Sequence, residues 1–223
     1  MLFTGIDISE SVIISLADGS NELLKETSYS IPVGDKWHAT SDFGDNIFHS
    51  DVVIVCVPTP VDSSMKPDLT SVRSALTSII ESKDPERKLT IIMESTVQPG
   101  TTRNCVIEII GNQDIENAGL MISYCPERVS PGEGGFGVEQ VGRVIGSDYP
   151  ELTKILAYLY NFITVGGVTP VDSVEIAEAS KLVENAQRDI DIAFVNELSI
   201  LLPKLGLDVE KVLEAADTKW NFH

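Results

Sequence analysis

Short, strongly apolar runs recur along much of the chain, and helix-like stretches separate several of them. A continuous apolar run of this length is typical of a parallel strand whose two faces are both covered by helices. Alternation of such runs with helical patterns predicts an α/β fold built on a doubly wound parallel sheet. The expected strands are residues 2–6, 52–57, 89–93 and 120–124, with weaker patterns at 143–145 and 163–165, and the expected helices are residues 69–81, 102–110 and 151–160.

The last third of the chain has a different pattern, because apolar residues recur at spacings of three and four from residue 172 to 202. This periodicity indicates one face of a long amphipathic helix. Pro203 disfavours its continuation, and Gly206 can end the segment. Asp208 can then cap a second helix.

This change of pattern predicts two parts. We expect an α/β domain in residues 1–170, followed by a helical segment in residues 171–223, with the boundary near Pro170. The α/β part is expected to be an incomplete Rossmann-like sheet, because the glycine fingerprint that should precede its first apolar run is absent. About 30 residues of strand, glycine turn and helix are therefore expected to be missing upstream.

Composition and charge narrow the function. Sixteen basic against 34 acidic residues leave a net charge of −18, which repels nucleic acid, because phosphate binding needs clustered Lys and Arg. No run of 18 apolar residues exists, so no membrane-spanning helix is expected. Residues 1–11 carry no Lys or Arg, which argues against a secretory signal, and three widely spaced cysteines suit a cytoplasmic protein with reduced thiols. We assign no metal ligands.

The ends of the first two apolar runs carry candidate binding residues, since ligands of an open parallel sheet bind beyond the carboxyl ends of its strands. Asp7 ends the first run and can accept hydrogen bonds from the ribose hydroxyls of an adenosine cofactor, or it can simply cap a helix. Val57, Pro58 and Thr59 end the second run in a stiff loop with few free N–H groups. The Thr59 amide and hydroxyl can meet a ligand, or the prolines can merely end the strand.

The next two runs end in polar loops. Residues 94–102 contain the hydroxyl of Thr96 at a strand–helix turn, where it can hold a cofactor or a water, or cap the helix. Glu127, Arg128 and Val129 follow the fourth run. An adjacent acid and base can orient a sugar and a phosphate, although a surface ion pair is the commoner meaning of such a dipeptide.

The long helical pattern adds Lys181, Asn185 and Arg188, spaced so that they project from one stripe beside the apolar face. A solvated polar face is one interpretation of this stripe. The other is a site that contains Lys181 as a catalytic cation or base, because a Lys held near apolar residues shifts its pKa readily.

Together these segments resemble the UDP-glucose/GDP-mannose dehydrogenase family, almost without insertions from residue 1 to 223. PERV and the ending LEAADTKWNF are most similar to the UDP-N-acetylglucosamine 6-dehydrogenase branch, which takes part in polysaccharide biosynthesis. The matching stretches are Thr4–Asp7, VPTPVD (57–62) with PDL (67–69), ESTVQPGTT (94–102), PERVSPG (126–132), KLVENAQRDIDIAFVNEL (181–198) and LEAADTKWNF (213–222).

The resemblance implies an NAD-dependent oxidation of a UDP-sugar at C6, from alcohol to carboxylate in two steps, through a cysteine thioester. Asp7 then matches the ribose-binding acid, and Val57, Pro58 and Thr59 match the loop beside the nicotinamide half. Thr96 matches a residue that touches the cofactor and helps to position a catalytic water.

The same resemblance assigns the remaining residues to substrate and catalysis. Glu127 matches the acid associated with thioester hydrolysis and with both ligands, and Arg128 and Val129 match the neighbouring substrate loop. Lys181 and Asn185 match the pair that stabilises the developing oxyanion, and Arg188 lies on their stripe at the substrate side. The helical segment corresponds to the family's dimer interface, so a homodimer is expected.

The chain departs from the family because two of the family's motifs, one before and one after these stretches, are absent from its sequence. It lacks the GxGxxG turn that cradles the cofactor pyrophosphate, and it stops at Asn221-Phe222-His223, before the motif with the catalytic cysteine. Cys125 precedes a proline on the cofactor side and is not expected to replace that cysteine. We therefore expect no turnover by the isolated chain. Two alternatives stay open: a non-catalytic dimerisation module, and a dehydrogenase of the 6-phosphogluconate or β-hydroxyacid type, which also spaces a Lys and an Asn four apart on a long helix.

Overall fold

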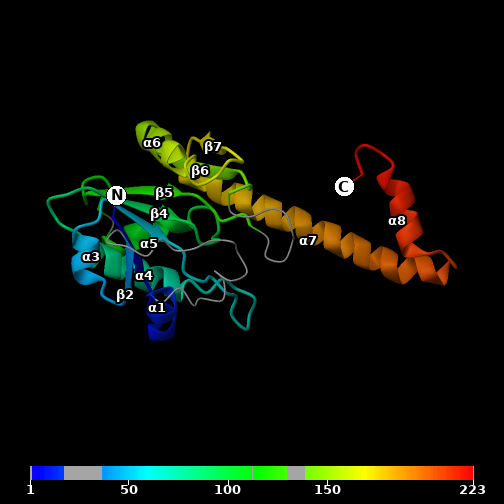
Figure 1. The fold of residues 1–223 in the computed structure, drawn as a ribbon, viewed down its shortest axis with the longest axis horizontal. Helices are drawn as coiled ribbons and strands as arrows, with labels where there is room; N and C mark the ends of the chain where they lie inside the picture. Colours follow the sequence, from blue (N-terminus) through cyan, green and yellow to red (C-terminus); the bar gives the residue numbers. More distant parts are fainter. Residues whose placement is uncertain (1, 18–36, 112, 130–138, 223) are drawn as a thin grey trace. The chain divides into compact units, whose positions relative to one another are not determined.

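The computed structural model describes residues 2–17, 37–111, 113–129 and 139–222 (Figure 1). Strands and helices alternate through most of this length, as the hydrophobic pattern predicts. The strands are β1 (Phe3–Ile6), β2 (Trp37–Thr40), β3 (Val52–Val55), β4 (Leu89–Met93), β5 (Leu120–Tyr124), β6 (Arg143–Ser147) and β7 (Val168–Val171). The helices are α1 (Glu10–Ala17), α3 (Gly44–Phe48), α4 (Thr70–Ser82), α5 (Thr101–Ile109), α6 (Pro150–Tyr160), α7 (Val174–Lys204) and α8 (Val209–Asp217).

In the described part of the chain the strands form two separate sheets. Strands β1 and β2 pair in parallel, and the larger sheet has the order β3-β4-β5-β6-β7. Its pairs are parallel except for β5 and β6, which run antiparallel, with Tyr124 opposite Gly146. The mixed α/β architecture with a mainly parallel sheet confirms the predicted fold class.

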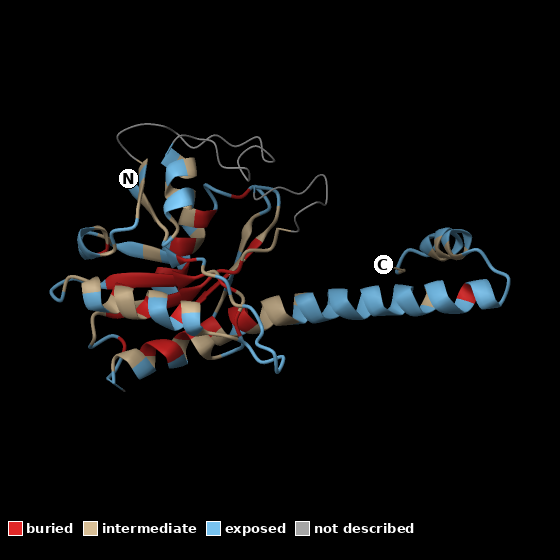
Figure 2. Ribbon diagram, turned by 90° about the horizontal axis from the view of Figure 1, so that it is seen from below, coloured by how far each residue is buried: buried red, intermediate tan, exposed pale blue. Residues whose placement is uncertain are grey.

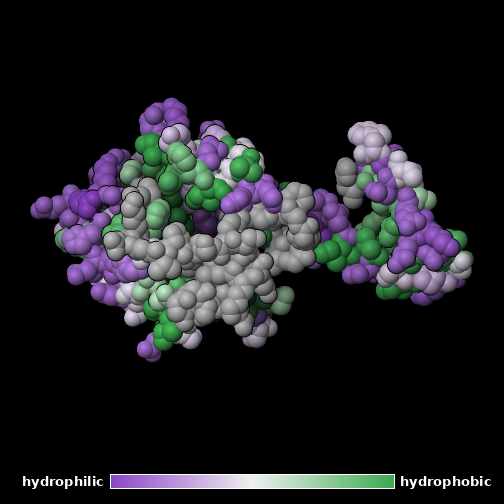
Figure 3. Space-filling model, in the orientation of Figure 1, coloured by the Kyte–Doolittle hydropathy of each residue, from purple (hydrophilic) through white to green (hydrophobic). Residues whose placement is uncertain are grey.

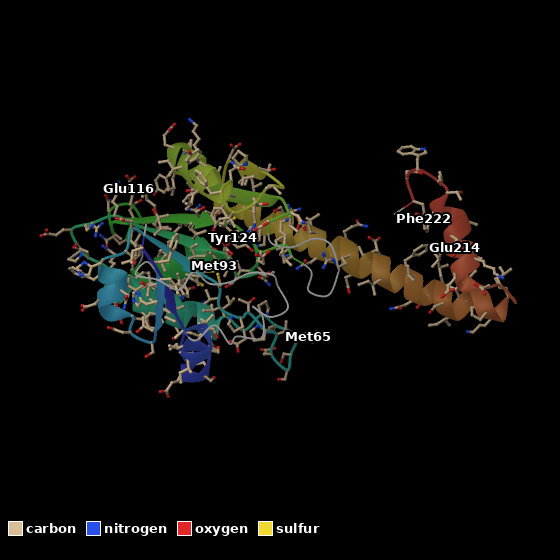
Figure 4. The ribbon with its side chains drawn as sticks, in the orientation of Figure 1. Met65, Met93, Glu116, Tyr124, Glu214 and Phe222 are labelled. Carbon is tan, nitrogen blue, oxygen red and sulfur yellow. The ribbon has the colours of Figure 1, made fainter. Side chains whose placement is uncertain are left out.

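The core lies on both faces of the larger sheet, since β4 is buried at all five positions. One face packs against α4 and α5, and its apolar cluster includes Ile91 and Met93 of β4. The opposite face packs against α6 and includes Ile92 of β4. Figure 2 shows the buried central strands, and Figure 4 shows Met93 and Tyr124 near the middle of the sheet, where their strands pair.

Chain contacts divide the protein into two compact units, Met1–Ala179 and Ser180–His223. The second unit contains most of α7 together with α8. Pro203 lies inside α7, which ends one residue later at Lys204, and Gly206 adopts a left-handed φ of 72° just beyond. Asp208 caps α8, as predicted, by accepting a hydrogen bond from the Lys211 amide at 3.1 Å.

Two strand predictions need correction. Residues 163–165 form no strand; the strand β7 begins three residues later, at Val168. The run at 143–145 is a strand, but β6 is antiparallel to β5. A continuous apolar run is typical of a parallel strand, yet the burial on both faces that it records is also possible for an antiparallel strand within a mixed sheet. The sequence pattern also missed β2, α1 and α3. Among the described residues, none of the helices combines the length and hydrophobicity needed to cross a bilayer.

Candidate functional site

A hollow of about 400 Å³ opens where β3, β4 and β5 end at their carboxyl side. This is the edge at which an open parallel sheet binds its ligands, and the volume lies within the usual range for small-molecule sites. Three of the predicted loops therefore meet here. The hollow is lined by Cys56, Glu94, Ser95, Thr96 and Glu127.

Two hydroxyl groups tie the loops after β3 and β4 together. Ser95 Oγ donates to the carbonyl of Val57 at 2.6 Å, and Thr59 Oγ1 donates to the carbonyl of Thr96 at 2.7 Å. The Thr59 hydroxyl, predicted to meet a ligand, therefore holds the two loops in register in this structure. Thr96 is half-buried and lines the hollow, while Pro58 is exposed.

Arg143 places a cation beneath the hollow. Its side chain is only 4% exposed and lies between two carboxylates, with Nη2 2.6 Å from Glu127 Oε2 and Nη1 3.7 Å from Glu94 Oε2. Because β6 runs antiparallel to β5, its first residue lies at the edge where β4 and β5 end. Burial acts to lower the pKa of Arg143, but the charges of Glu127 and Glu94 outweigh it and raise the pKa.

Glu127 is held by three donors. Besides the ion pair with Arg143, its Oε1 accepts hydrogen bonds from the backbone amides of Arg128 at 2.6 Å and Val129 at 2.8 Å. The Arg128 guanidinium donates to the carbonyl of Gly142 at 2.7 Å. These contacts fix the position of the Glu127 carboxyl group and order the start of its loop. Residues 130–132 of the PERVSPG motif lie outside the described residues.

Glu94 is the more enclosed of the two carboxylates, with a side chain 13% exposed. The hydroxyl of Tyr160, at the end of α6, donates to Glu94 Oε1 at 2.5 Å, and the ring of Tyr160 lies 5.9 Å from the Arg143 guanidinium carbon. Burial raises the pKa of Glu94 even though the Tyr160 hydrogen bond and the Arg143 charge oppose the shift. Burial and the charge of Glu94 also raise the pKa of Tyr160, so its hydroxyl stays a donor.

The cysteines near this site are poor nucleophiles. Cys56 is an exposed residue, but its thiol faces the hollow and lies 3.9 Å from Glu94 Oε2. Loss of solvent around the thiol, followed by the charges of Glu94 and Glu127, raises the pKa of Cys56 to about 12. Cys125 is fully buried, and burial likewise raises its pKa to about 12. A thiol needs its thiolate form to attack, so neither thiol is well suited to act as a nucleophile in this arrangement.

Asp7 follows β1, as predicted, and is half-buried. Its Oδ1 accepts a hydrogen bond from the Ser9 amide at 2.8 Å, just before α1 begins. The Asp7 carboxylate therefore stabilises the turn before α1, but it does not accept from an amide of the helix itself. A carboxylate can also accept from ribose hydroxyls through its remaining lone pairs, so the cofactor role of Asp7 stays a prediction.

Lys181, Asn185 and Arg188 all lie on α7 within the second unit. Lys181 is half-buried, and Asn185 and Arg188 are exposed. Their helical spacing is as predicted, whereas their convergence with the loops of the first unit stays a prediction.

Sequence reasoning did not single out Glu94, Arg143, Tyr160 or Cys56. Glu94 had the clearest signal, because it is a charged residue directly at the end of a fully apolar strand. The signal for Arg143 was weaker: of the first residues of the predicted strands, it alone is charged. Its place in the site required knowledge that the strand reverses. Nothing in the sequence around Tyr160 indicates that its hydroxyl belongs to the site, because a tyrosine on α6 is explained equally well by packing of its ring in the core.

The fold and this hollow define a dinucleotide-binding type of α/β protein, with hydroxyls and carboxylates at the carboxyl edge of a mainly parallel sheet. Residues 2–165 match the NAD binding domain of the UDP-glucose/GDP-mannose dehydrogenase family, and residues 175–223 match its central domain. The chain belongs to this family.

Individual relatives agree. A UDP-N-acetyl-D-glucosamine 6-dehydrogenase of Pseudomonas aeruginosa is 36% identical over 220 residues, which are 98% of this chain and 51% of that protein. A protein of the same name from Salmonella typhi is 30% identical with the same coverage. The chain thus spans about half the length of the curated relatives it matches.

Solved structures give the same picture. The UDP-D-ManNAc dehydrogenase of Pyrococcus horikoshii superimposes with a TM-score of 0.81 at 27% identity, over 98% of this chain and 52% of that one. The 3-hydroxyisobutyrate dehydrogenase of Mycobacterium tuberculosis covers 83% of this chain and 56% of its own, with a TM-score of 0.63 at 18% identity. That second likeness concerns the fold alone, so the β-hydroxyacid alternative gains no functional support from it.

Proposed function

We propose that this chain is part of an NAD-dependent nucleotide-sugar 6-dehydrogenase that oxidises the C6 alcohol of a UDP-N-acetylhexosamine to a uronate, for polysaccharide biosynthesis in the cytoplasm. The observation that carries the proposal is the hollow after β3, β4 and β5, which lies within the region that matches an NAD binding domain. The names of the two bacterial relatives support the substrate class.

The predicted cofactor residues would contact the two ends of NAD. Asp7 would accept hydrogen bonds from the adenosine ribose, and the loop Val57-Pro58-Thr59 with Thr96 would flank the nicotinamide half. The volume of about 400 Å³ suits a nicotinamide with its ribose better than a whole dinucleotide. When bound, NAD⁺ supplies the hydride acceptor for the oxidation of the alcohol.

The chain's own residues would then hold the substrate and manage charge. Glu127 is anchored by Arg143 and by a backbone amide, and it can orient a sugar hydroxyl or a water. Arg128 and Val129 would form the adjoining substrate loop. Lys181 and Asn185 would stabilise the oxyanion that develops at C6, and Arg188 would contact the substrate beside them.

The test has two parts. Isothermal titration of the chain with NAD⁺ should show saturable binding, and substitution Thr96→Ala should weaken it. With UDP-N-acetylglucosamine and NAD⁺ together, we expect no NADH absorbance above a Lys181→Ala control. Absence of NAD⁺ binding would reject the cofactor assignment, whereas NADH formation above the control would reject the expectation that the isolated chain is inactive.

We further propose that the chain forms a homodimer through α7. Val183, Ile190, Phe194 and Leu201 lie at helical spacing and are between 51% and 67% exposed. Figure 3 shows hydrophobic residues at the surface of α7 and α8. An exposed apolar stripe of this kind is typical of an interface. Sedimentation that shows only monomers at micromolar concentration would reject the dimer.

A further inference from the structure

The walls of the hollow carry more negative than positive charge. Among the described residues that line it, two are carboxylates, Glu94 and Glu127, and none is a Lys or an Arg. One cation, Arg143, lies beneath them and is shared by both carboxylates. When both acids are ionised, this group of three keeps one net negative charge.

The excess charge belongs chiefly to Glu94. Arg143 lies 2.6 Å from Glu127 but 3.7 Å from Glu94, so the short ion pair is made with Glu127. Glu127 also accepts from two backbone amides, whereas the hydrogen bonds to Glu94 come from the uncharged Tyr160 hydroxyl and Cys56 thiol. With a side chain 13% exposed, Glu94 is also poorly screened by water.

A negative wall distinguishes the two redox forms of the proposed cofactor. The nicotinamide ring is positively charged in NAD⁺ and neutral in NADH, and the rest of the molecule is the same. A carboxylate near the ring therefore stabilises the oxidised form selectively, by Coulomb attraction in a partly enclosed site. The positive charge disappears when the ring accepts hydride, so the same carboxylate would favour release of the reduced form.

We propose that Glu94 is a specificity-determining residue that makes this hollow prefer NAD⁺ over NADH. The inference rests on the proposed cofactor site and goes beyond it, because it assigns the redox preference to one side chain. No bond is formed or broken by Glu94 in this role.

The experiment compares dissociation constants of NAD⁺ and NADH by isothermal titration at about pH 8, well above the ordinary pKa of a glutamate. Glu94→Gln should lower the ratio of the NADH constant to the NAD⁺ constant by roughly three- to tenfold, the scale expected for one partly screened charge. Glu94→Asp, which keeps the charge, should retain most of the wild-type ratio. Glu151→Gln is the matched control, since Glu151 is an exposed carboxylate on α6.

The same ratio of dissociation constants, measured on the wild-type chain over a range of pH, tests the role of Glu94 without a substitution. Cys56, Glu127, Arg143 and Tyr160 are the titratable groups that act on Glu94 from the neighbouring elements. Burial raises the pKa of Glu94, so the preference for NAD⁺ should be complete at high pH and fall as pH drops through that pKa. In Glu94→Gln the ratio should no longer change with pH over this range.

The outcomes separate the two proposals. Binding of both forms with a ratio unchanged by Glu94→Gln and by pH would overturn the role of Glu94 and leave the cofactor site intact. Binding of neither form to the wild-type chain would overturn the cofactor site and the redox preference together. Equal loss of affinity for both forms in Glu94→Gln and Glu94→Asp would show a structural role and would also overturn the proposal.

Discussion

Two buried or nearly buried glutamates of the first unit have different roles, one at the hollow and one at the end of a helix. Glu94 faces a hollow, whereas Glu178 is fully buried at the start of α7 and accepts hydrogen bonds from the amides of Gly100 at 2.5 Å and Thr102 at 2.9 Å. Those amides open α5, where a helix has unsatisfied donors and favours a negative charge. Glu178 is therefore a cap supplied from a distant part of the sequence.

Removal of this cap should be costly. Glu178→Ala leaves the buried amide of Thr102 and the half-buried amide of Gly100 without their acceptor and opens a cavity, so we expect a loss of about 2–4 kcal/mol in the free energy of unfolding. Urea unfolding followed by circular dichroism would measure it. Glu197→Ala, at an exposed position of the same helix, should change stability by less than about 0.5 kcal/mol. Equal effects of the two substitutions would contradict the capping role.

The thiol of Cys56 reports the charge of the hollow. Its pKa of about 12 means that almost no thiolate exists near neutral pH, so alkylation by iodoacetamide should be slow for an exposed cysteine. Glu94→Gln removes one of the charges that raise this pKa and should speed alkylation by about threefold or more. Peptide mass spectrometry would follow Cys56 separately from the buried Cys105 and Cys125. An unchanged rate would show that Glu94 does not act on the thiol.

At the scale of elements, the antiparallel direction of strand β6 determines which cation lies beside the hollow. Its reversal brings Arg143 to the binding edge, and it packs closely against the start of α7. Gly146 makes the approach possible, because a Cβ there would collide with the carbonyl oxygen of Ser173 and lie 3.0 Å from Ala177 Cβ.

Gly146→Ala should therefore separate β6 from α7. Backbone atoms cannot move aside as a flexible side chain can, so we expect a loss of about 3 kcal/mol or more in the free energy of unfolding. Gly111→Ala is the control, since Gly111 has open space around it and only its positive φ of 68° resists a side chain. That substitution should cost about 1 kcal/mol. Thermal unfolding of both variants would test the difference, and similar melting temperatures would refute it.

At the scale of the whole molecule, the net charge of −18 opposes the association that the apolar stripe on α7 favours. Salt screens repulsion between like-charged copies but leaves apolar contact in place. The dimer should therefore tighten by about threefold or more between roughly 0.02 M and 0.3 M sodium chloride, where the screening length falls severalfold. Sedimentation equilibrium at both salt concentrations would measure the change, and Phe194→Glu should abolish dimerisation. A dimer that weakens with salt would show that ion pairs hold it instead.

Hydrophobic patterning along the chain was enough to predict the α/β class, the positions of β4 and β5 and the long helix, because burial on two faces or on one stripe leaves a periodic trace in the residues themselves. The ordered motifs around Asp7, Thr59, Thr96, Glu127 and Lys181 were enough to indicate the family. Neither kind of signal identifies the one strand that runs against its neighbour, or the distant residues that come into contact. Only the folded chain shows that β6 reverses, that Arg143 thereby lies between Glu94 and Glu127, and that Tyr160 reaches Glu94 from α6. These contacts join residues that are far apart in the sequence and depend on how the strands and α6 are arranged in space. Such an arrangement leaves no periodic pattern in a single sequence.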